Sequence, residues 1–200
     1  SQISSRRRID MLRQFAELAG CTLSDLLDIC LARGAVTFSK RRVSLYRQGV
    51  NIPLDELRPL HEVPVCPVCI NENGYGRQLW HFRSYTVCHQ HGIALISHCR
   101  CGASLNMAEQ EFSGSCHSCG ASLLEQTENA YDPELTLSAW LSGESNEHLP
   151  NVVQSHRWGL IHWFRHYVAS GECITEDTFF SYFKAWPDSL FEKLKSDFTK

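Results

Sequence analysis

The sequence has no run of apolar residues long enough to cross a bilayer, and its first residues lack the pattern of a secretion signal. We therefore expect no membrane partner. It also lacks the phosphate-binding motif G-x-x-x-x-G-K-[ST] and the zinc-protease motif H-E-x-x-H. The segment H-E-V-P-V-C-P-V-C does not reproduce the paired H-x-E and P-C-x-x-C motifs of zinc deaminases. These absences predict a protein that is not an enzyme.

A strong excess of one charge is missing too, since 19 Lys and Arg stand against 22 Asp and Glu and the formal net charge is −3. Overall charge would not draw such a chain to nucleic acid, so any contact has to be local. For each basic run, a solvated surface is the simpler interpretation. The basic residues that could instead contact nucleic acid or a partner are Arg6, Arg7, Arg8, Lys40, Arg41, Arg42 and Arg47.

Cysteine, by contrast, is abundant, with ten residues in a chain of 200. Seven of the ten fall between positions 66 and 119, in segments that read C-P-V-C, C-H-Q-H, C-R-C and C-H-S-C. Three of these four segments have the two-residue spacing by which a tight turn directs two ligands at one metal ion. The disulfide framework of a secreted protein is the alternative, but a mixed Cys/His pair has no role in one. The spacing therefore predicts zinc.

We predict two structural Zn²⁺ ions, each held by four side chains. The first set is Cys66, Cys69, Cys88 and His91, and the second is Cys99, Cys101, Cys116 and Cys119. An interleaved assignment stays open, as does replacement of a ligand by a neighbouring histidine (His89, His98 or His117). Four protein ligands leave no position for an activated water, so both sites are expected to be structural.

The remaining cysteines and the aromatic residues of the zinc-binding segment are expected to be buried. The apolar surroundings of Cys21, Cys30 and Cys173 predict buried free thiols. Between the first two ligand pairs, the aromatic residues predict the apolar packing that small metal-binding domains need, with a stacking platform for bases as the alternative. These packing residues are Trp80, Phe82, Tyr85 and Val87.

Helical periodicity marks the N-terminal region. Residues 5–19 carry an apolar stripe that Gly20 ends. Thr22 or Ser24 can cap a second helix that runs to about Arg33, with Gly34 stopping it. The pair has the spacing of a helix-turn-helix.

The second of these helices is acidic. Its exposed positions include Asp25 and Asp28, which the phosphates of DNA would repel. A structural or protein-binding helix pair is therefore favoured over one that reads DNA.

Helical patterns return towards the C-terminus, over residues 155–169, over 176–185 and, after Pro187, in an amphipathic stretch to Lys200. The predicted fold is mainly α, with a central two-zinc ribbon or knuckle module between a helix-turn-helix-like part and a helical C-terminal part. We expect boundaries at 1–58, 59–125 and 126–200. The chain begins at Ser1 rather than Met, which suggests a fragment, and we expect it to be incomplete at both ends.

The zinc-binding segment resembles that of the TniQ family, the target-selection proteins of certain bacterial transposons, which includes TnsD. The resemblance rests on C-P-V-C at 66–69, V-C-H-Q-H-G-I-A-L at 87–95, C-R-C at 99–101 and C-H-S-C-G at 116–120, with Arg77 and Trp80 between the first two. The later stretches L-S-A-W-L, R-W-G-L-I-H-W-F and A-W-P are similar to members that serve CRISPR-associated transposons with a type I-F Cascade.

The resemblance implies an adaptor in RNA-guided DNA transposition. Such a protein would bridge a guide-RNA-loaded Cascade complex at the target to the ATPase TnsC, as a head-to-tail homodimer. It would work in the bacterial cytoplasm, at the nucleoid when bound to target DNA. A free-standing zinc-ribbon protein that binds DNA as a regulator is the alternative function.

Overall fold

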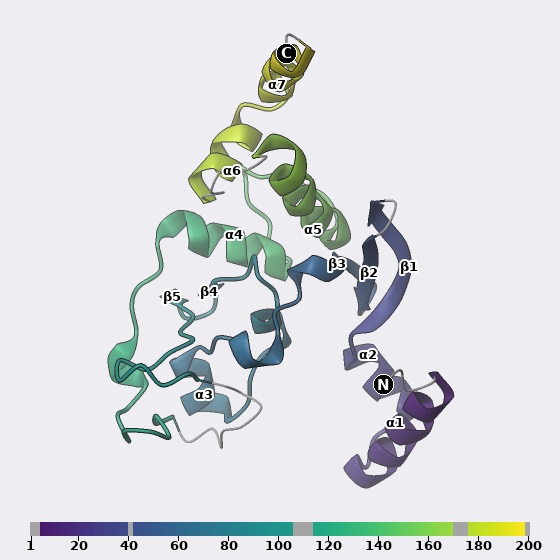
Figure 1. Ribbon diagram of the computed structural model, residues 1–200, viewed down its shortest axis with the longest axis vertical. Coiled ribbons are helices and arrows are strands. Elements are labelled where there is room, and N and C mark those ends of the chain that lie inside the picture. The colour runs from purple at the N-terminus through teal and green to yellow at the C-terminus, as the bar shows by residue number, and fades with distance from the viewer. Residues whose placement is uncertain (1–4, 40–41, 106–113, 170–175, 199–200) are drawn as a thin grey trace. The chain divides into compact units, whose positions relative to one another are not determined.

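The structure, a computed structural model, describes residues 5–39, 42–105, 114–169 and 176–198 (Figure 1). The chain divides into two units, Ser1–Leu54 and Asp55–Lys200. Each unit contains helices and one small antiparallel sheet. The second unit holds both the cysteine-rich segment and the C-terminal helices.

The first unit begins with the two predicted helices, α1 (Ser5–Ala19) and α2 (Leu23–Ile29), which pack on each other. Gly20 ends α1 in the left-handed region, with φ of 67°. Thr22 caps α2 in a capping box with Asp25, as one of the two predicted caps. Of the predicted α1 stripe, Ala16 is buried whereas Phe15 is 60% exposed, so the helix leaves part of its apolar face uncovered within this chain.

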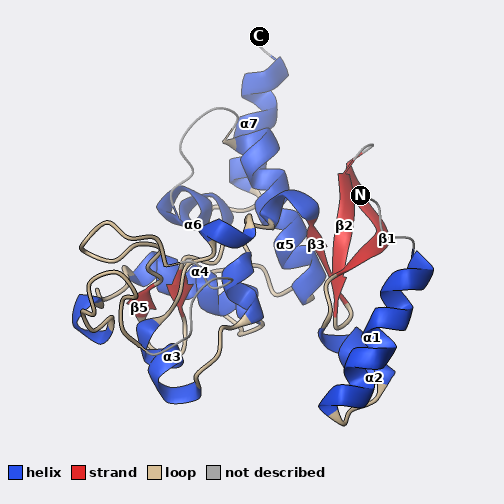
Figure 2. Cartoon of the chain, turned by 60° about the horizontal axis from the view of Figure 1, so that its bottom comes forward, coloured by secondary structure: helices blue, strands red, loops and turns tan. Residues whose placement is uncertain are grey.

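A three-stranded sheet follows α2, so the helix-turn-helix-like region expected over residues 1–58 is not helical throughout. The second helix does not reach Arg33 but ends at Ile29, and Gly34 lies inside a strand. The strands β1 (Ala32–Ser39), β2 (Arg42–Arg47) and β3 (Val50–Pro53) form an antiparallel meander in that order, drawn in red in Figure 2. The β-branched and aromatic residues of A-V-T-F-S and R-V-S-L-Y-R favour strands over helix.

The turn between β2 and β3 is a two-residue hairpin loop, because Arg47 pairs with Val50. Both loop residues have positive φ, 45° at Gln48 and 81° at Gly49. This is the combination that matches the twist of a hairpin, and Asn-Gly is its preferred sequence.

The turn yields a matched pair of predictions. Gly49→Ala should lower the free energy of unfolding of the first unit by about 1 kcal/mol, because a Cβ is disfavoured at positive φ. Nothing lies within 4 Å of the added carbon, so the backbone alone sets this cost. Gln48→Asn should instead raise stability by a few tenths of a kcal/mol, since Asn tolerates this conformation. Urea unfolding of both variants measures the difference, and equal destabilisation by the two would contradict the assignment of this turn.

The second unit begins with short turns and ends in helices. Its 3₁₀ helices are η1 (Leu54–Glu56, which starts at the boundary between the units), η2 (Leu60–Glu62), η3 (Gln78–His81) and η4 (Leu124–Gln126). The helix α3 (Pro67–Asn73) and the hairpin of β4 (Val87–Cys88) and β5 (Ile93–Ala94) lie in the cysteine-rich segment. The C-terminal elements are α4 (Asp132–Ser142), α5 (Gln154–Trp163), the π-helical turn η5 (Phe164–Val168), α6 (Glu176–Lys184) and α7 (Asp188–Phe198).

These elements confirm the helices predicted over 155–169, over 176–185 and after Pro187. The hydrophobic periodicity did not predict the π-helical turn within the first of them. In the part of the chain that the structure describes, no helix has the length and apolar character that a bilayer span requires.

One hydrophobic core connects the cysteine-rich segment to the C-terminal helices. The helix α4 lies against β4, α5 and α6. The rings of Phe82 and Trp158 are 5.1 Å apart, and those of Trp140 and Phe179 are 5.9 Å apart. The four predicted packing residues Trp80, Phe82, Tyr85 and Val87 are all 0% exposed. Their side chains therefore pack inside the protein and offer no face on which a base could stack.

Candidate metal centres

The first ligand pair, Cys66 and Cys69, lies at the start of α3. Cys66 is the N-cap residue and Pro67 is the first residue of the helix, where a missing N–H costs nothing. The backbone N–H of Cys69 donates to the Sγ of Cys66 over 3.4 Å. The C-P-V-C sequence thus folds into a turn that directs both sulfurs to the same side.

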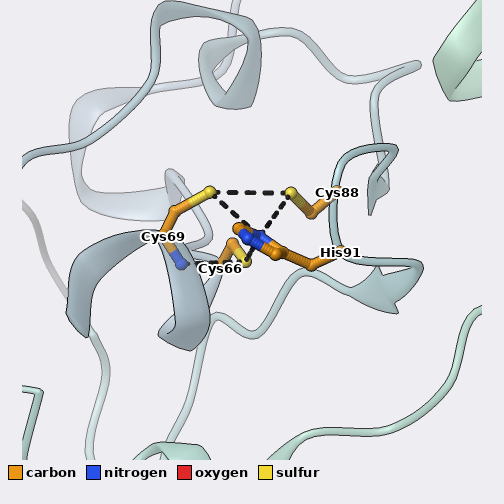
Figure 3. A group of neighbouring side chains, drawn as sticks. All are labelled: Cys66, Cys69, Cys88 and His91. Carbon is orange, nitrogen blue, oxygen red and sulfur yellow. Dashed lines mark hydrogen bonds between the residues drawn. The ribbon is translucent and has the colours of Figure 1, made fainter. Parts of the chain in front are cut away.

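The second pair, Cys88 and His91, belongs to the β4–β5 hairpin. Cys88 ends β4, and its carbonyl accepts from the backbone N–H groups of His91 and Gly92. Gly92 has φ of 63°, a conformation that glycine adopts without strain. The turn brings His91 back over Cys88, and Figure 3 shows all four side chains pointing toward one another.

The distances within this group fit a metal ion. Cys69 Sγ and Cys88 Sγ are 3.6 Å apart, and His91 Nδ1 is 3.3–3.4 Å from all three sulfurs. A disulfide would need about 2.05 Å between its sulfurs. A tetrahedral Zn²⁺ with its usual bond lengths needs about 3.8 Å between sulfurs and about 3.5 Å between sulfur and nitrogen. The four donors could therefore hold one metal ion.

Two further side chains contact these ligands from outside. Glu72 Oε2 lies 3.0 Å from His91 Nε2, so the ring nitrogen that faces away from the sulfurs has a carboxylate partner. Such a partner orients a metal-binding histidine and makes it a better ligand. Arg77 Nε donates to Cys69 Sγ over 3.1 Å, and this hydrogen bond raises the pKa of Arg77. The second contact places a positive charge beside a candidate ligand sulfur.

Glu72 supports a prediction for the first site. Glu72→Gln should weaken metal binding by about 10–100-fold, because the histidine loses its charged partner. Competition with a chromophoric chelator measures the affinity, and Glu128→Gln, an exposed glutamate elsewhere in the segment, is the control. Equal affinities of the two variants would show that the Glu72 contact does not tune the site.

The second ligand set comes from two small hairpin-like turns. Isolated bridges pair His98 with Ser104 and Ser115 with Ser122, and Gly102 and Gly120 take positive φ within these turns. The sulfurs of Cys99 and Cys119 are 3.7 Å apart, and those of Cys101 and Cys116 are 3.8 Å apart. These are again tetrahedral edge lengths, and the four thiols form a group that could hold a metal ion.

Gln126, at the end of η4, connects to this second group. Its Nε2 donates to Cys99 Sγ over 3.4 Å, and its Oε1 accepts from the backbone N–H of Arg100 over 2.8 Å. The side chain is 7% exposed. Gln126 and Glu72 are functional candidates that sequence reasoning missed. Glu72 has a weak sequence signal, because it lies three residues after Cys69 on the same helix, whereas Gln126 has none.

The ligand thiols differ in pKa, because the hydrogen bonds among them lower some values and raise others. Hydrogen bonding with Cys66 lowers the pKa of Cys88 to about 4, while the same contact raises the pKa of Cys66. The backbone N–H of Cys101, with help from Gln126, lowers the pKa of Cys99 to about 6. The ligand thiols that still carry a proton would release it when a metal binds.

The structure describes the remaining predicted residues only in part. The backbones of Arg6, Arg7, Arg8 and Arg42 lie in α1 and β2, but their side chains, like Lys40, Arg41 and Cys173 as a whole, lie outside the described residues. Arg47 ends β2 half-buried, and burial lowers its pKa. Cys21 and Cys30 are free thiols, but each is half-buried rather than buried, because both flank the short α2 at its ends.

Comparison with known proteins gives one family. No curated protein matches the chain. A family model matches residues 2–95, a segment that covers the first unit from its second residue and the first four candidate ligands, and ends before Cys99. The family that this model describes is TniQ.

Proposed function

We propose that this chain is a non-enzymatic adaptor of the TniQ type in RNA-guided DNA transposition. It would bridge a guide-RNA-loaded Cascade complex at the target to the ATPase TnsC. The family match over residues 2–95 carries the proposal, because it covers the first unit together with the first metal-binding group. The cysteine pairs beyond residue 95 extend the resemblance to the family, and the tryptophan-containing stretches towards the C-terminus extend it to the type I-F members.

We assign two Zn²⁺ ions to the two groups, in a structural role. Three thiolates with one imidazole, and four thiolates, are donor sets that suit zinc. With four protein ligands each, neither ion would keep a position for an activated water, which supports a protein without catalysis. The ions would hold together a segment made mostly of turns, so that partner-binding surfaces lie elsewhere.

The surface of α2 supports a protein partner over DNA. Its exposed face combines Asp25 and Asp28 with the apolar side chains of Leu27 and Ile29, which are 47% and 56% exposed. Hydrogen bonds from Thr22 lower the pKa of Asp25, so this carboxylate is charged at neutral pH. Carboxylates on such a helix would repel phosphates. The basic residues from Arg6 to Arg8 and around Lys40 remain candidates for local contacts with RNA or a partner.

The proposal also includes a head-to-tail homodimer in the bacterial cytoplasm, at the nucleoid when target DNA is bound. A free-standing zinc-ribbon DNA-binding regulator is the alternative. The two functions differ in their DNA binding, because an adaptor with few basic residues makes few phosphate contacts and should bind naked duplex weakly.

Co-purification is the direct test. The tagged full chain, co-expressed with Cascade proteins and guide RNA, should be recovered with the RNA-loaded complex and should recruit TnsC to it. Omitting the guide RNA is the control. Tight, sequence-selective binding to naked duplex at physiological salt, without Cascade, would overturn the adaptor and establish the regulator.

A further inference from the structure

Two histidines of the C-terminal half face an aspartate that precedes the cysteine-rich segment. His162 lies near the end of α5 and His166 lies in the π-helical turn η5, four residues further along the same helical path. Residues at this spacing share one face of a helix. Asp55 belongs to η1, and all three residues are part of the second unit.

The donor atoms of these residues converge. One atom from each residue, a histidine nitrogen or a carboxylate oxygen, lies within 4.8 Å of the other two. Asp55 Oδ2 is 3.4 Å from His162 Nδ1 and 3.8 Å from His166 Nε2. The second separation is too long for a hydrogen bond, and the first is at the limit. With metal bonds of about 2.0–2.1 Å, adjacent ligands of a tetrahedral ion are about 3.3 Å apart, which is close to the shorter separation and within a small movement of the longer one.

The hydrogen bond of His166 uses the ring nitrogen that is not directed at Asp55. Its Nδ1 lies 3.0 Å from the backbone carbonyl of His162. A carbonyl can only accept, so Nδ1 carries the proton and Nε2, which faces Asp55, has the lone pair. Metal-binding histidines characteristically use their other ring N–H for a backbone carbonyl or a carboxylate in this way.

Burial and charge also fit a cation. His162 is 4% exposed, whereas the side chains of Asp55 and His166 are 39% and 34% exposed, so the group is anchored inside and open on one side. The two imidazole rings are 4.2 Å apart at 30°, close enough for two imidazolium charges to repel each other. The neighbouring Arg165 forms an ion pair with the buried Glu56, which offsets its charge next to such an ion.

The π-helical geometry of η5 is a further observation. Such turns are rare and often occur at functional sites, because they reorient side chains relative to an α-helix. Here the turn spans Phe164–Val168 and carries His166.

We propose that Asp55, His162 and His166 bind one divalent transition-metal ion, of the class of Zn²⁺, Ni²⁺ or Co²⁺, as a third metal site distinct from the two cysteine groups. Two imidazoles and one carboxylate form the donor set, which suits these metals and leaves at least one coordination position for water or an external ligand. With three ligands instead of four, this site binds more weakly and exchanges its metal, while the cysteine groups keep theirs. A bound ion would connect η1 to α5.

Cobalt titration of the zinc-loaded full chain tests this site, after treatment with a weak chelator that removes exchangeable metal. The protein should take up one equivalent of Co²⁺ with visible d–d absorption but without thiolate-to-cobalt charge-transfer bands, because the donors are nitrogen and oxygen. The metal should also raise the thermal unfolding temperature. His166→Ala and Asp55→Asn should each abolish both effects. His156→Ala, which removes an exposed histidine from the same helix, should leave both unchanged.

Three outcomes would overturn the proposal. The first is the absence of an additional equivalent in the folded wild-type protein. The second is cobalt absorption that includes thiolate charge-transfer bands, which would mean that cobalt had replaced zinc in a cysteine group. The third is retention of the equivalent in Asp55→Asn, whose side chain is nearly isosteric. If His166→Ala does not fold, as circular dichroism would reveal, Asp55→Asn decides the question alone.

Discussion

Cys69→Ser should abolish cooperative folding of the second unit. Structural zinc contributes about 10–16 kcal/mol of apparent binding free energy in small zinc-dependent domains, which is comparable with the whole stability of an ordinary domain. Cys69 is 0% exposed, and burial already raises the pKa of its thiol, so a serine would leave a buried hydroxyl where a metal-bound thiolate belongs. We expect elemental analysis to give about two tightly bound zinc ions per wild-type chain and about one in the variant. Near-UV circular dichroism and urea unfolding report the loss of folding.

The chain contains a matched control for this substitution. Cys21→Ser changes a half-buried free thiol of the first unit in the same way and should alter neither zinc content nor unfolding of the second unit. Two zinc ions and cooperative unfolding in Cys69→Ser would show that the first site does not hold metal through this sulfur.

The two cysteine groups should differ in how readily they lose metal. In the first group all three cysteines are 0% exposed, whereas Cys101 and Cys119 of the second group are exposed. A strong chelator should therefore remove the second ion first, and Cys116→Ser should destabilise the second unit less than Cys69→Ser does. Timed chelation with zinc analysis checks the order, and simultaneous release of both ions would contradict it.

Trp158→Ala should lower the free energy of unfolding of the second unit by about 3–5 kcal/mol, the usual cost of deleting a large buried aromatic side chain. Trp158 is 0% exposed and packs on Phe82, 76 positions earlier in the chain. The substitution therefore removes a contact between the cysteine-rich segment and α5, and urea unfolding followed by circular dichroism measures the loss.

A second tryptophan supplies the control. Trp186 is 48% exposed, so Trp186→Ala should lower the free energy of unfolding by less than half as much as Trp158→Ala. Comparing the two losses also tests whether the cysteine-rich segment has a hydrophobic core of its own. Equal, small losses in both variants would mean that this segment folds independently of the C-terminal helices.

Local pattern was sufficient to indicate the two groups that could hold metal ions and to predict most helices. The x₂ spacing of Cys66/Cys69, Cys88/His91 and Cys116/Cys119 brings two donors together within a single turn, so these pairs depend little on the rest of the fold. Helices α1 and α5–α7 were predictable for a similar reason, because hydrophobic periodicity and caps such as Thr22 act over a few residues.

The sheet of the first unit was missed because two local preferences compete there. Residues 32–39 follow an amphipathic helix directly, and their small and polar residues allowed the helical periodicity to be extended through Arg33. The turn between β2 and β3 was also hard to predict, because its first residue is Gln48, which has a positive φ. Two-residue hairpin loops usually have Asn at this position, so the sequence Gln-Gly does not indicate a hairpin.

The sequence by itself determined which residues could bind metal in pairs, because turn geometry is local. Only the tertiary structure decided which pairs meet, that Glu72 and Gln126 support them, and that Trp158 packs on Phe82. It alone brings Asp55 to His162 and His166, across more than 100 positions of the chain. The physical reason is the same in each case. Contacts between distant segments depend on how the core packs, and core packing is a property of all the elements together.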